Sequence, residues 1–387
     1  MASKEHSFVI FYNISHLNSS LLDANSSTPK YNIYEEYTLL KDSLITSHDN
    51  PFNIFLIVLY IGAFAIGFIG NVFVILVVLR HRHMRTLTNV FFFNLTIGDF
   101  MVNCICIPTT LFFYIYRDWI FGETLCRLTP FFQSTAVSVS VLSMLSISVN
   151  RYFAIHIPLR AKILFSRNRV HVMLASIWGI SLGAFSPMLY INKVTTYGLP
   201  DIFTVRACHE VWTIAELKHG YNLIIFLLLF LLPLTVMSAL YLKISMALWS
   251  KNRQLFSNAR KQACMSTPVD RLLLQRRKTV RTLVLLVVLF AGSWFPYYVV
   301  YFWLEFNSRS LYVSVVNTFV YPLAQLVGLS NSSINPILYC FLSNGFRRAL
   351  LNMCCRRSKR TRNGLVMTVR YRCSDDSGVG SVETVLS

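Results

Sequence analysis

The sequence predicts an all-α membrane protein, a seven-transmembrane helix bundle followed by a short amphipathic eighth helix. Three observations lead to this fold class. Of the 387 residues, 54% are hydrophobic and only 14% are charged, against about 25% charged in an ordinary soluble domain. Seven apolar stretches are each long enough to cross a bilayer, which takes about 20 residues in a helix. The basic residues gather in alternate connecting segments, as they do in proteins that thread a membrane.

The seven stretches fill most of the chain between its two tails. They run over residues 52–79, 87–116, 124–149, 170–192, 220–242, 282–304 and 311–341. Most contain a proline, and because neighbouring groups in a membrane bundle can satisfy the freed carbonyl, we expect kinked, packed helices. The expected parts are an extracellular tail at 1–50, a seven-transmembrane domain at 51–342, a juxtamembrane amphipathic helix at 343–355 and a cytoplasmic tail at 356–387.

The charges predict the orientation. The segments after the first, third and fifth spans and the C-terminal tail contain 27 of the 36 Lys and Arg residues. Because such segments stay in the cytoplasm, we expect a multi-pass protein of the plasma membrane with its N-terminus outside. The net charge of +19 then separates into −3 outside, −1 within the spans and +23 inside. This separation argues against nucleic-acid binding, which needs its basic residues on one folded face.

The N-terminal tail also fits the outside. It has no apolar stretch of the length that a signal peptide needs, so the first span is expected to act as an uncleaved anchor. Three Asn-x-Ser sequons, which begin at Asn13, Asn18 and Asn25, predict N-glycosylation on that side.

Two pairs of cysteines have expected roles. Cys126 opens the third span and Cys208 lies in the long loop before the fifth. Both face the oxidising side, so we expect a disulfide between them, with two buried thiols as the alternative. Cys354 and Cys355 follow an amphipathic run at 344–353. That run predicts a helix on the inner membrane surface with palmitoylated cysteines behind it, and ordinary free thiols are the alternative.

One acidic side chain, Asp99, lies inside a span. A charge at that depth costs several kcal/mol unless it is paired or hydrated, so a functional role is expected. Hydroxyl and amide oxygens beside a single carboxylate suit a hard cation. A protonated Asp99 in a structural hydrogen-bond network is the alternative. The polar residues at a similar depth are Asn71, Ser140, Asn331, Ser332 and Asn335.

Other membrane machines fit the sequence poorly. An aspartyl intramembrane protease needs two carboxylates, and no buried His accompanies Ser293 as a serine protease would require. An odd number of spans without a visible internal repeat argues against a transporter built from repeated halves. No filter-like loop indicates a channel. We therefore expect no enzymatic activity and, apart from an allosteric ion, no cofactor.

Landmarks in all seven spans follow one another in order and at fitting spacing. They are Gly70-Asn71, Asn94-Leu95 with Asp99, Trp119 with Phe121-Gly122 and Cys126, Asn150-Arg151-Tyr152, Trp178, Pro233 with Tyr241, Phe290 with Trp294 and Pro296, Asn335-Pro336-Ile337-Leu338-Tyr339, and Phe346. Through these residues the chain resembles a rhodopsin-like (class A) G-protein-coupled receptor over about residues 50–355.

The resemblance implies a two-state bundle, biased by a ligand on one side and a heterotrimeric G protein on the other. Arg151 would insert toward the G protein, and Tyr241 and Tyr339 would stabilise the open state through water. Trp294 would transmit the effect of ligand contact toward the cytoplasmic side, where the G protein binds. The remaining implied site is a sodium pocket that collapses on activation, formed by Asp99, Ser140, Asn331 and Asn335.

Two residues depart from the family pattern. Asn150, which precedes Arg151 and Tyr152, stands where the family usually has Asp or Glu, and Arg276 stands where an acid often clamps the arginine. Arg151 therefore lacks both usual carboxylate partners. We expect a less clamped inactive state with raised basal signalling, and the alternative is that Asn150 still hydrogen-bonds Arg151.

The family pattern also narrows the chemical class of the expected ligand. Gln133 stands where amine receptors carry Asp, and no Lys in the seventh span can form a retinal Schiff base. Gln133 is a neutral donor and acceptor, suited to a peptide amide. Cys208-His209-Glu210-Val211-Trp212 and Pro108-Thr109-Thr110-Leu111 resemble receptors of the orexin, neuropeptide FF and SIFamide group, which bind C-terminally amidated peptides, often ending near Arg-Phe-amide.

The expected ligand is a cationic neuropeptide, because the negative outer surface would attract it. Glu210 is the first candidate partner for a ligand Arg, ahead of Asp201, Glu216 and Glu305. The residues expected to line the pocket below are Gln133, Trp294, Tyr297 and Tyr301.

Inside, the basic rim is expected to meet anionic membrane lipid and an acidic G-protein surface. The tail contains candidate phosphorylation sites for arrestin docking at Ser374, Ser377, Ser381 and Thr384, and a plain disordered tail is the alternative. Two alternative functions stay open: a class A receptor for a lipid or other non-peptide ligand, and an orphan or constitutively active receptor.

Overall fold

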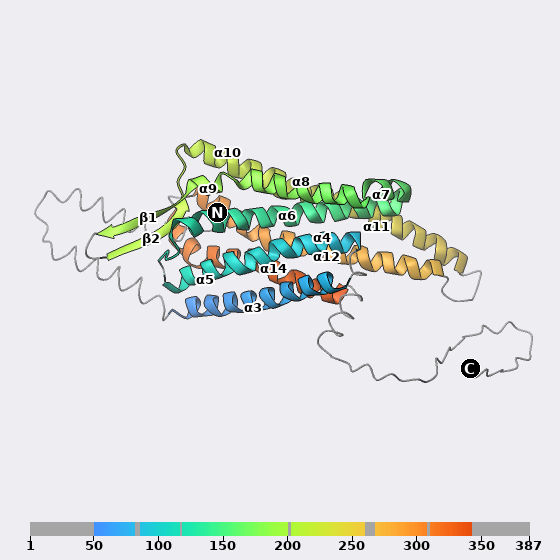
Figure 1. Cartoon of the computed structure of the whole chain (residues 1–387), viewed down its shortest axis with the longest axis horizontal. Coiled ribbons are helices and arrows are strands. Elements are labelled where there is room, and N and C mark those ends of the chain that lie inside the picture. The colour runs from blue at the N-terminus through green and yellow to red at the C-terminus, as the bar shows by residue number, and fades with distance from the viewer. Residues whose placement is uncertain are drawn as a thin grey trace, which may run out of the picture.

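The computed structural model describes residues 50–81, 86–116, 118–199, 203–259, 268–307 and 310–342. Within these ranges the chain forms a bundle of long helices that lie side by side along the longest axis of the molecule (Figure 1). Some of the sequence predictions lie outside the described residues and stay predictions. They concern Asn13, Asn18 and Asn25, the helix at 343–355 with Cys354 and Cys355, and the tail at 356–387.

Helices occupy all seven predicted spans, so the predicted all-α bundle is confirmed. They are α3 (Pro51–Arg80), α4 with α5 (Leu87–Met101 and Ile107–Tyr116), α6 (Gly122–His156), α8 (Arg167–Phe185), α10 with α11 (Ala215–Phe226 and Leu232–Ala259), α12 (Pro268–Phe306) and α14 (Tyr321–Leu342). Helix α7 (Pro158–Leu164) connects two spans, whereas α9 (Met188–Ile191) ends the fourth span and α13 (Val313–Val315) begins the seventh. Of the described helical spans, six are long and apolar enough to cross a membrane; α14 carries the polar run 330–333.

Capping residues determine where two of the spans begin. The Asn50 side chain accepts a hydrogen bond from the Phe52 backbone N–H at 3.0 Å. Pro51 takes the first helical position, where a missing donor costs nothing. Thr86 likewise accepts from the Asn89 N–H at 3.4 Å. Both helices therefore start at a polar residue that satisfies their first unpaired donors.

Three of the spans contain one wide π-helical turn, and each turn stands just before a proline. The turns are Val102–Cys106, Leu227–Leu231 and Val316–Val320. In each case the residue that precedes the proline donates its N–H to the carbonyl five positions back. Proline lacks the donor that a regular helix needs and crowds the carbonyl four residues earlier. The wide turn relieves that crowding without ending the helix.

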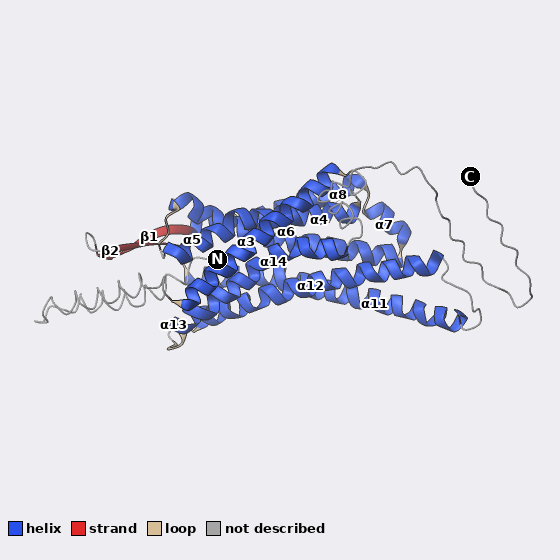
Figure 2. Cartoon of the chain, turned by 90° about the horizontal axis from the view of Figure 1, so that it is seen from below, coloured by secondary structure: helices blue, strands red, loops and turns tan. Residues whose placement is uncertain are grey.

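A β-hairpin that we did not predict covers one end of the bundle. Strand β1 (Asn192–Leu199) pairs antiparallel with β2 (Phe203–Glu210), with Asn192 opposite Glu210 and Val194 opposite Cys208. We interpreted this segment only as a long loop. The hairpin projects beyond the helices at the end opposite α7 and the far ends of α11 and α12, as the turned view in Figure 2 also shows.

The central helix is α6, which packs against α4, α8 and α11. A chain of hydrogen bonds fastens it to two neighbours. Trp178 Nε1 of α8 donates to Asn94 Oδ1 of α4 at 2.8 Å, and Asn94 Nδ2 donates to Ser143 Oγ of α6 at 2.8 Å. Trp178 and Asn94 are landmark positions of the sequence. Their hydrogen bonds fix how far α4, α6 and α8 are shifted along the bundle axis relative to one another.

Candidate functional site

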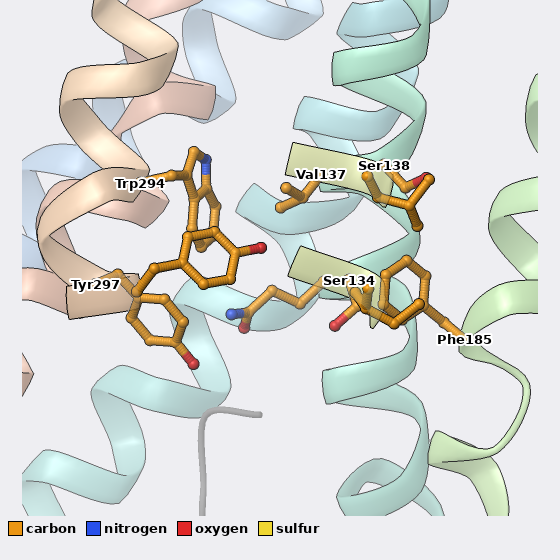
Figure 3. A pocket seen from close by; sticks show the side chains of 10 residues that line it. Ser134, Val137, Ser138, Phe185, Trp294 and Tyr297 are labelled. Carbon is orange, nitrogen blue, oxygen red and sulfur yellow. The ribbon is translucent and has the colours of Figure 1, made fainter. Parts of the chain in front are cut away.

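A cavity lies between α6, α8, α10 and α12 in the half of the bundle nearer the hairpin. It contains about 430 Å³ of empty space, counting its opening to solvent. Figure 3 shows Trp294 and Tyr297 of α12 facing Ser134 and Val137 of α6 across it. The lining residues are Gln133, Ser134, Val137, Ser138, Phe185, Ile225, Leu229, Trp294, Tyr297 and Tyr298. The predicted residues Gln133, Trp294 and Tyr297 are therefore brought together here.

Two of the lining side chains carry buried polar atoms that have no hydrogen-bond partner among the described residues. They are Gln133 Oε1, an acceptor, and Trp294 Nε1, a donor. Gln133 is 3% exposed and Trp294 5%. Leaving a buried polar atom unpaired costs about 1–3 kcal/mol. Gln133 Oε1 can accept a hydrogen bond from a ligand N–H, and Trp294 Nε1 can donate one to a ligand carbonyl.

Tyr301, the fourth predicted ligand residue on the helices, lies one turn above the lined cavity. Its ring stacks near that of Tyr297, with ring centroids 6.3 Å apart. Its hydroxyl accepts a hydrogen bond from Asn222 Nδ2 of α10 at 2.6 Å. Tyr301 is therefore placed to close the cavity toward the extracellular end.

Glu210 ends strand β2 above the cavity and is 3% exposed. Its Oε2 accepts a hydrogen bond from Trp212 Nε1 at 2.8 Å. The Trp212 ring packs against Tyr221 of α10, with centroids 5.4 Å apart. Trp212 thus packs in the loop beside Glu210. Among the other candidate acids, Glu305 forms an ion pair with Lys218, and Asp201 lies outside the described residues.

The predicted disulfide between Cys126 and Cys208 is confirmed, with the two Cα atoms 5.5 Å apart. It ties β2 to the start of α6. A second attachment comes from Arg206, whose guanidinium donates to Asp118 Oδ2 at 2.6 Å. The hydrogen bond and the charge of Asp118 raise the pKa of Arg206 above its ordinary value. The hairpin that carries Glu210 is therefore attached both to the start of α6 and to the loop before it.

Asp99 lies at the centre of a polar cluster between α3, α4 and α14 and is 1% exposed. Asn335 Nδ2 donates to Asp99 Oδ2 at 2.8 Å, and the Ser332 side chain also hydrogen-bonds Asp99. Asn71 Nδ2 donates to the Ser332 carbonyl at 3.1 Å. Asn71 Oδ1 is buried without a hydrogen-bond partner among the described residues, which fits a site for a hard cation. The other two predicted members, Ser140 and Asn331, are also buried.

The predicted G-protein end lies at the far ends of α6, α11 and α14. Ser148 Oγ donates to the Tyr241 hydroxyl at 2.8 Å, and Arg151 and Tyr241 interact electrostatically. Tyr152 packs on His156, with centroids 4.6 Å apart. Tyr339 is buried against Phe92, with centroids 4.7 Å apart. Asn150 is partly buried beside Arg151, and the Arg276 side chain lies outside the described residues.

Sequence reasoning missed seven of the ten residues that line the cavity. Ser134, Val137 and Ser138 line it with Gln133. Positions 133, 134, 137 and 138 lie on one face of a helix, so the helical period around Gln133 would have identified them. Ile225, Leu229 and Phe185 are ordinary apolar residues in apolar helices, and nothing in their sequence marks them.

The fold and these sites define a class of protein. Residues 70–339 match the family described as 7 transmembrane receptor (rhodopsin family). The chain belongs to this family, the class A G-protein-coupled receptors, and is a multi-pass membrane protein. Because members of the family are receptors, the expectation that the chain is not an enzyme is confirmed.

Several relatives are peptide receptors. The chain is 32% identical over 307 residues to the QRFP-like peptide receptor of Branchiostoma floridae, covering 77% of this chain and 76% of the relative. It is 33% identical over 294 residues to the pyroglutamylated RF-amide peptide receptor of Rattus norvegicus, covering 76% and 68%. It is 30% identical over 297 residues to neuropeptide FF receptor 2 of Rattus norvegicus, covering 74% and 69%. The predicted likeness to neuropeptide receptors is confirmed.

Proposed function

We propose that this chain is a plasma-membrane receptor for an extracellular neuropeptide, C-terminally amidated and cationic, and that it signals to heterotrimeric G proteins. The observation that carries the proposal is the pair of open polar atoms in the cavity, Gln133 Oε1 and Trp294 Nε1. A terminal peptide amide offers an N–H to the first and a carbonyl to the second. The peptide receptors among the relatives support the same ligand class.

The cationic part of the ligand is assigned to the acidic end of the bundle. With its N-terminus outside, the chain carries a net charge of −3 on that side, which attracts a basic peptide and speeds its encounter. Glu210 stands above the cavity at the end of β2. A peptide whose C-terminal amide reaches Gln133 would place a preceding basic residue near Glu210.

The test is an amidated-peptide library applied to cells that express the full chain, with calcium and cyclic-nucleotide readouts. Gln133→Leu removes the oxygen and nitrogen of the side-chain amide and keeps the volume of the side chain similar. We expect it to lower the potency of an active amidated peptide about tenfold, because one buried hydrogen bond is lost. We also expect it to remove the preference for the amide over the free acid. Thr235→Ala, exposed on α11, is the control. Equal potency of amide and acid on the wild type would contradict the proposal.

A second candidate function is signalling without a ligand. Asn150 favours it, because an amide cannot form the ion pair with Arg151 that a carboxylate would form. A high signal that no library member changes would support this candidate. A response to lipid but not to peptide would instead identify a non-peptide ligand.

Further partners belong to the same proposal. Asp99, Ser140, Asn331 and Asn335 would hold an allosteric sodium ion, which would supply a positive charge beside the buried carboxylate. Asn150, Arg151, Tyr152, Tyr241 and Tyr339 would face the G protein. The basic inner rim, to which Lys243 and Arg281 contribute, would contact anionic lipid. The tail serines would recruit arrestin once phosphorylated.

A further inference from the structure

Two contacts join α10 to α12 above the cavity, one helical turn apart. Asn222 Nδ2 of α10 donates to the Tyr301 hydroxyl of α12 at 2.6 Å. One turn nearer the extracellular end, Lys218 of α10 forms an ion pair with Glu305 of α12. Tyr297, which lines the cavity, lies one further turn below Tyr301. Residues four apart share one face of a helix, so the contacts form a ladder that leads from the cavity to the outside.

The upper contact of this ladder is largely buried. The side chains of Lys218 and Glu305 are only 13% and 10% exposed. His219 Nδ1 lies 3.4 Å from the same Glu305 Oε1, and its ring stacks on Phe306, with centroids 5.8 Å apart. A charge pair held away from water interacts more strongly than one on an open surface. Glu305 is thus an acidic group at the mouth of the cavity whose charge is already balanced from within the chain.

We propose that Lys218 determines ligand specificity by occupying Glu305, an inference that rests on the function proposed above. A cationic side chain of the ligand can reach the Glu305 carboxylate only by displacing the Lys218 ammonium. Exchange of one cation for another yields little net attraction, so Glu305 adds little affinity for a basic ligand in the wild type. Removing Lys218 turns Glu305 into an open acidic subsite and raises the selectivity for positive charge.

The first test compares two probe peptides for binding to membranes that carry the full chain. One ends in Arg-Phe-amide, and the other has citrulline, an uncharged isostere, in place of Arg. We expect the ratio of their affinities to rise about tenfold in Lys218→Met, as for a desolvated charge contact. The ratio should return to the wild-type value in the double variant Lys218→Met/Glu305→Gln. Lys193→Met, which removes a lysine of the hairpin, is the matched control. An unchanged ratio in Lys218→Met overturns the inference.

The second test needs no peptide and therefore separates this inference from the proposed function. In Lys218→Cys, the rates of reaction with a cationic and an anionic methanethiosulfonate reagent are compared from the extracellular side. We expect the cationic reagent to be favoured, and that preference to fall about tenfold when Glu305→Gln is added. Equal preference in both variants, or no reaction above that of the parent chain, overturns the inference. The expected thiol result together with no peptide binding would refute only the proposed peptide ligand.

Discussion

Replacing Gly67 with Ala would test how tightly α3 packs against its neighbours. A Cβ at this position would overlap Asn103 Oδ1 and lie 2.5 Å from Ser333 Oγ. Asn103 is fully buried, and its Nδ2 donates to the Asp99 carbonyl at 2.8 Å. Ser333 Oγ donates to the Ala63 carbonyl at 2.7 Å. Neither side chain can move aside without breaking a buried hydrogen bond.

The expected cost is the balance of three effects. Overpacking a well-packed core position costs about 1–3 kcal/mol. Loss of the hydrogen bond between Ser333 Oγ and Asn103 Oδ1, at 3.3 Å, costs about 1 kcal/mol more. Alanine recovers about 1 kcal/mol over glycine in helix propensity. The Gly67→Ala substitution should therefore destabilise the folded receptor by about 2 kcal/mol, or about 4–8 °C in Tm.

The measurement is the thermal unfolding of the detergent-solubilised receptor. Gly62→Ala is the control on the same helix, because no atom lies within 4 Å of a Cβ placed there. We expect Gly62→Ala to leave Tm unchanged or to raise it slightly. Equal Tm values for the two alanine variants would refute the packing described for Gly67.

Three further predictions concern the ion, the inner end and the hairpin. Replacing NaCl by choline chloride should raise agonist affinity about threefold in the wild type, because the sodium ion proposed at Asp99 would favour the inactive state. Binding assays should show no such effect in Asp99→Asn. Asn150→Asp should lower basal second-messenger output by restoring a carboxylate beside Arg151, and equal output would contradict the raised-basal hypothesis. Because Asp118 raises the pKa of Arg206, any stability from that guanidinium is present at low pH and is lost only as pH rises through the raised value. Hydrogen exchange of the hairpin amides should therefore show no loss of protection between about pH 6 and pH 9 beyond the intrinsic rate, while Asp118→Asn should increase exchange at Arg206.

The features that hydropathy and charge determine were predictable. All seven spans follow from apolar length, since a helix is the only element that satisfies its own backbone in lipid. The Cys126–Cys208 disulfide followed from the side on which both residues lie. Trp294 and Gln133 were found through the resemblance to class A receptors, because both stand at positions that the family pattern marks.

The remaining features depend on tertiary contacts. The hairpin at 192–210 carries β-branched residues such as Val194, Thr195 and Thr196, a strand signal that we overlooked. The pairing of Lys218 with Glu305 joins residues 87 positions apart along the chain, and no local pattern connects them. Ile225 of α10 and Leu229 of the wide turn that follows resemble many lipid-facing residues, so only their position at the cavity distinguishes them.

The wide turns before the prolines have a consequence for how such receptors can change length. A π-helical turn holds one residue more than a regular turn, so it rotates everything after it by one position. In the fifth span, the cavity residues Ile225 and Leu229 come before the end of the wide turn. The buried residues after it are Met237, Tyr241 and Ile244. Each stands one sequence position later than the residue that would face inward if the helix were regular throughout. Deleting one residue from such a turn would convert it to a regular helix in which each half keeps its inward face, but the following proline would again crowd the carbonyl four residues earlier. The extra residue in each of these three segments therefore sets the facing of the helix on both sides of its proline and lets the proline remain inside the span.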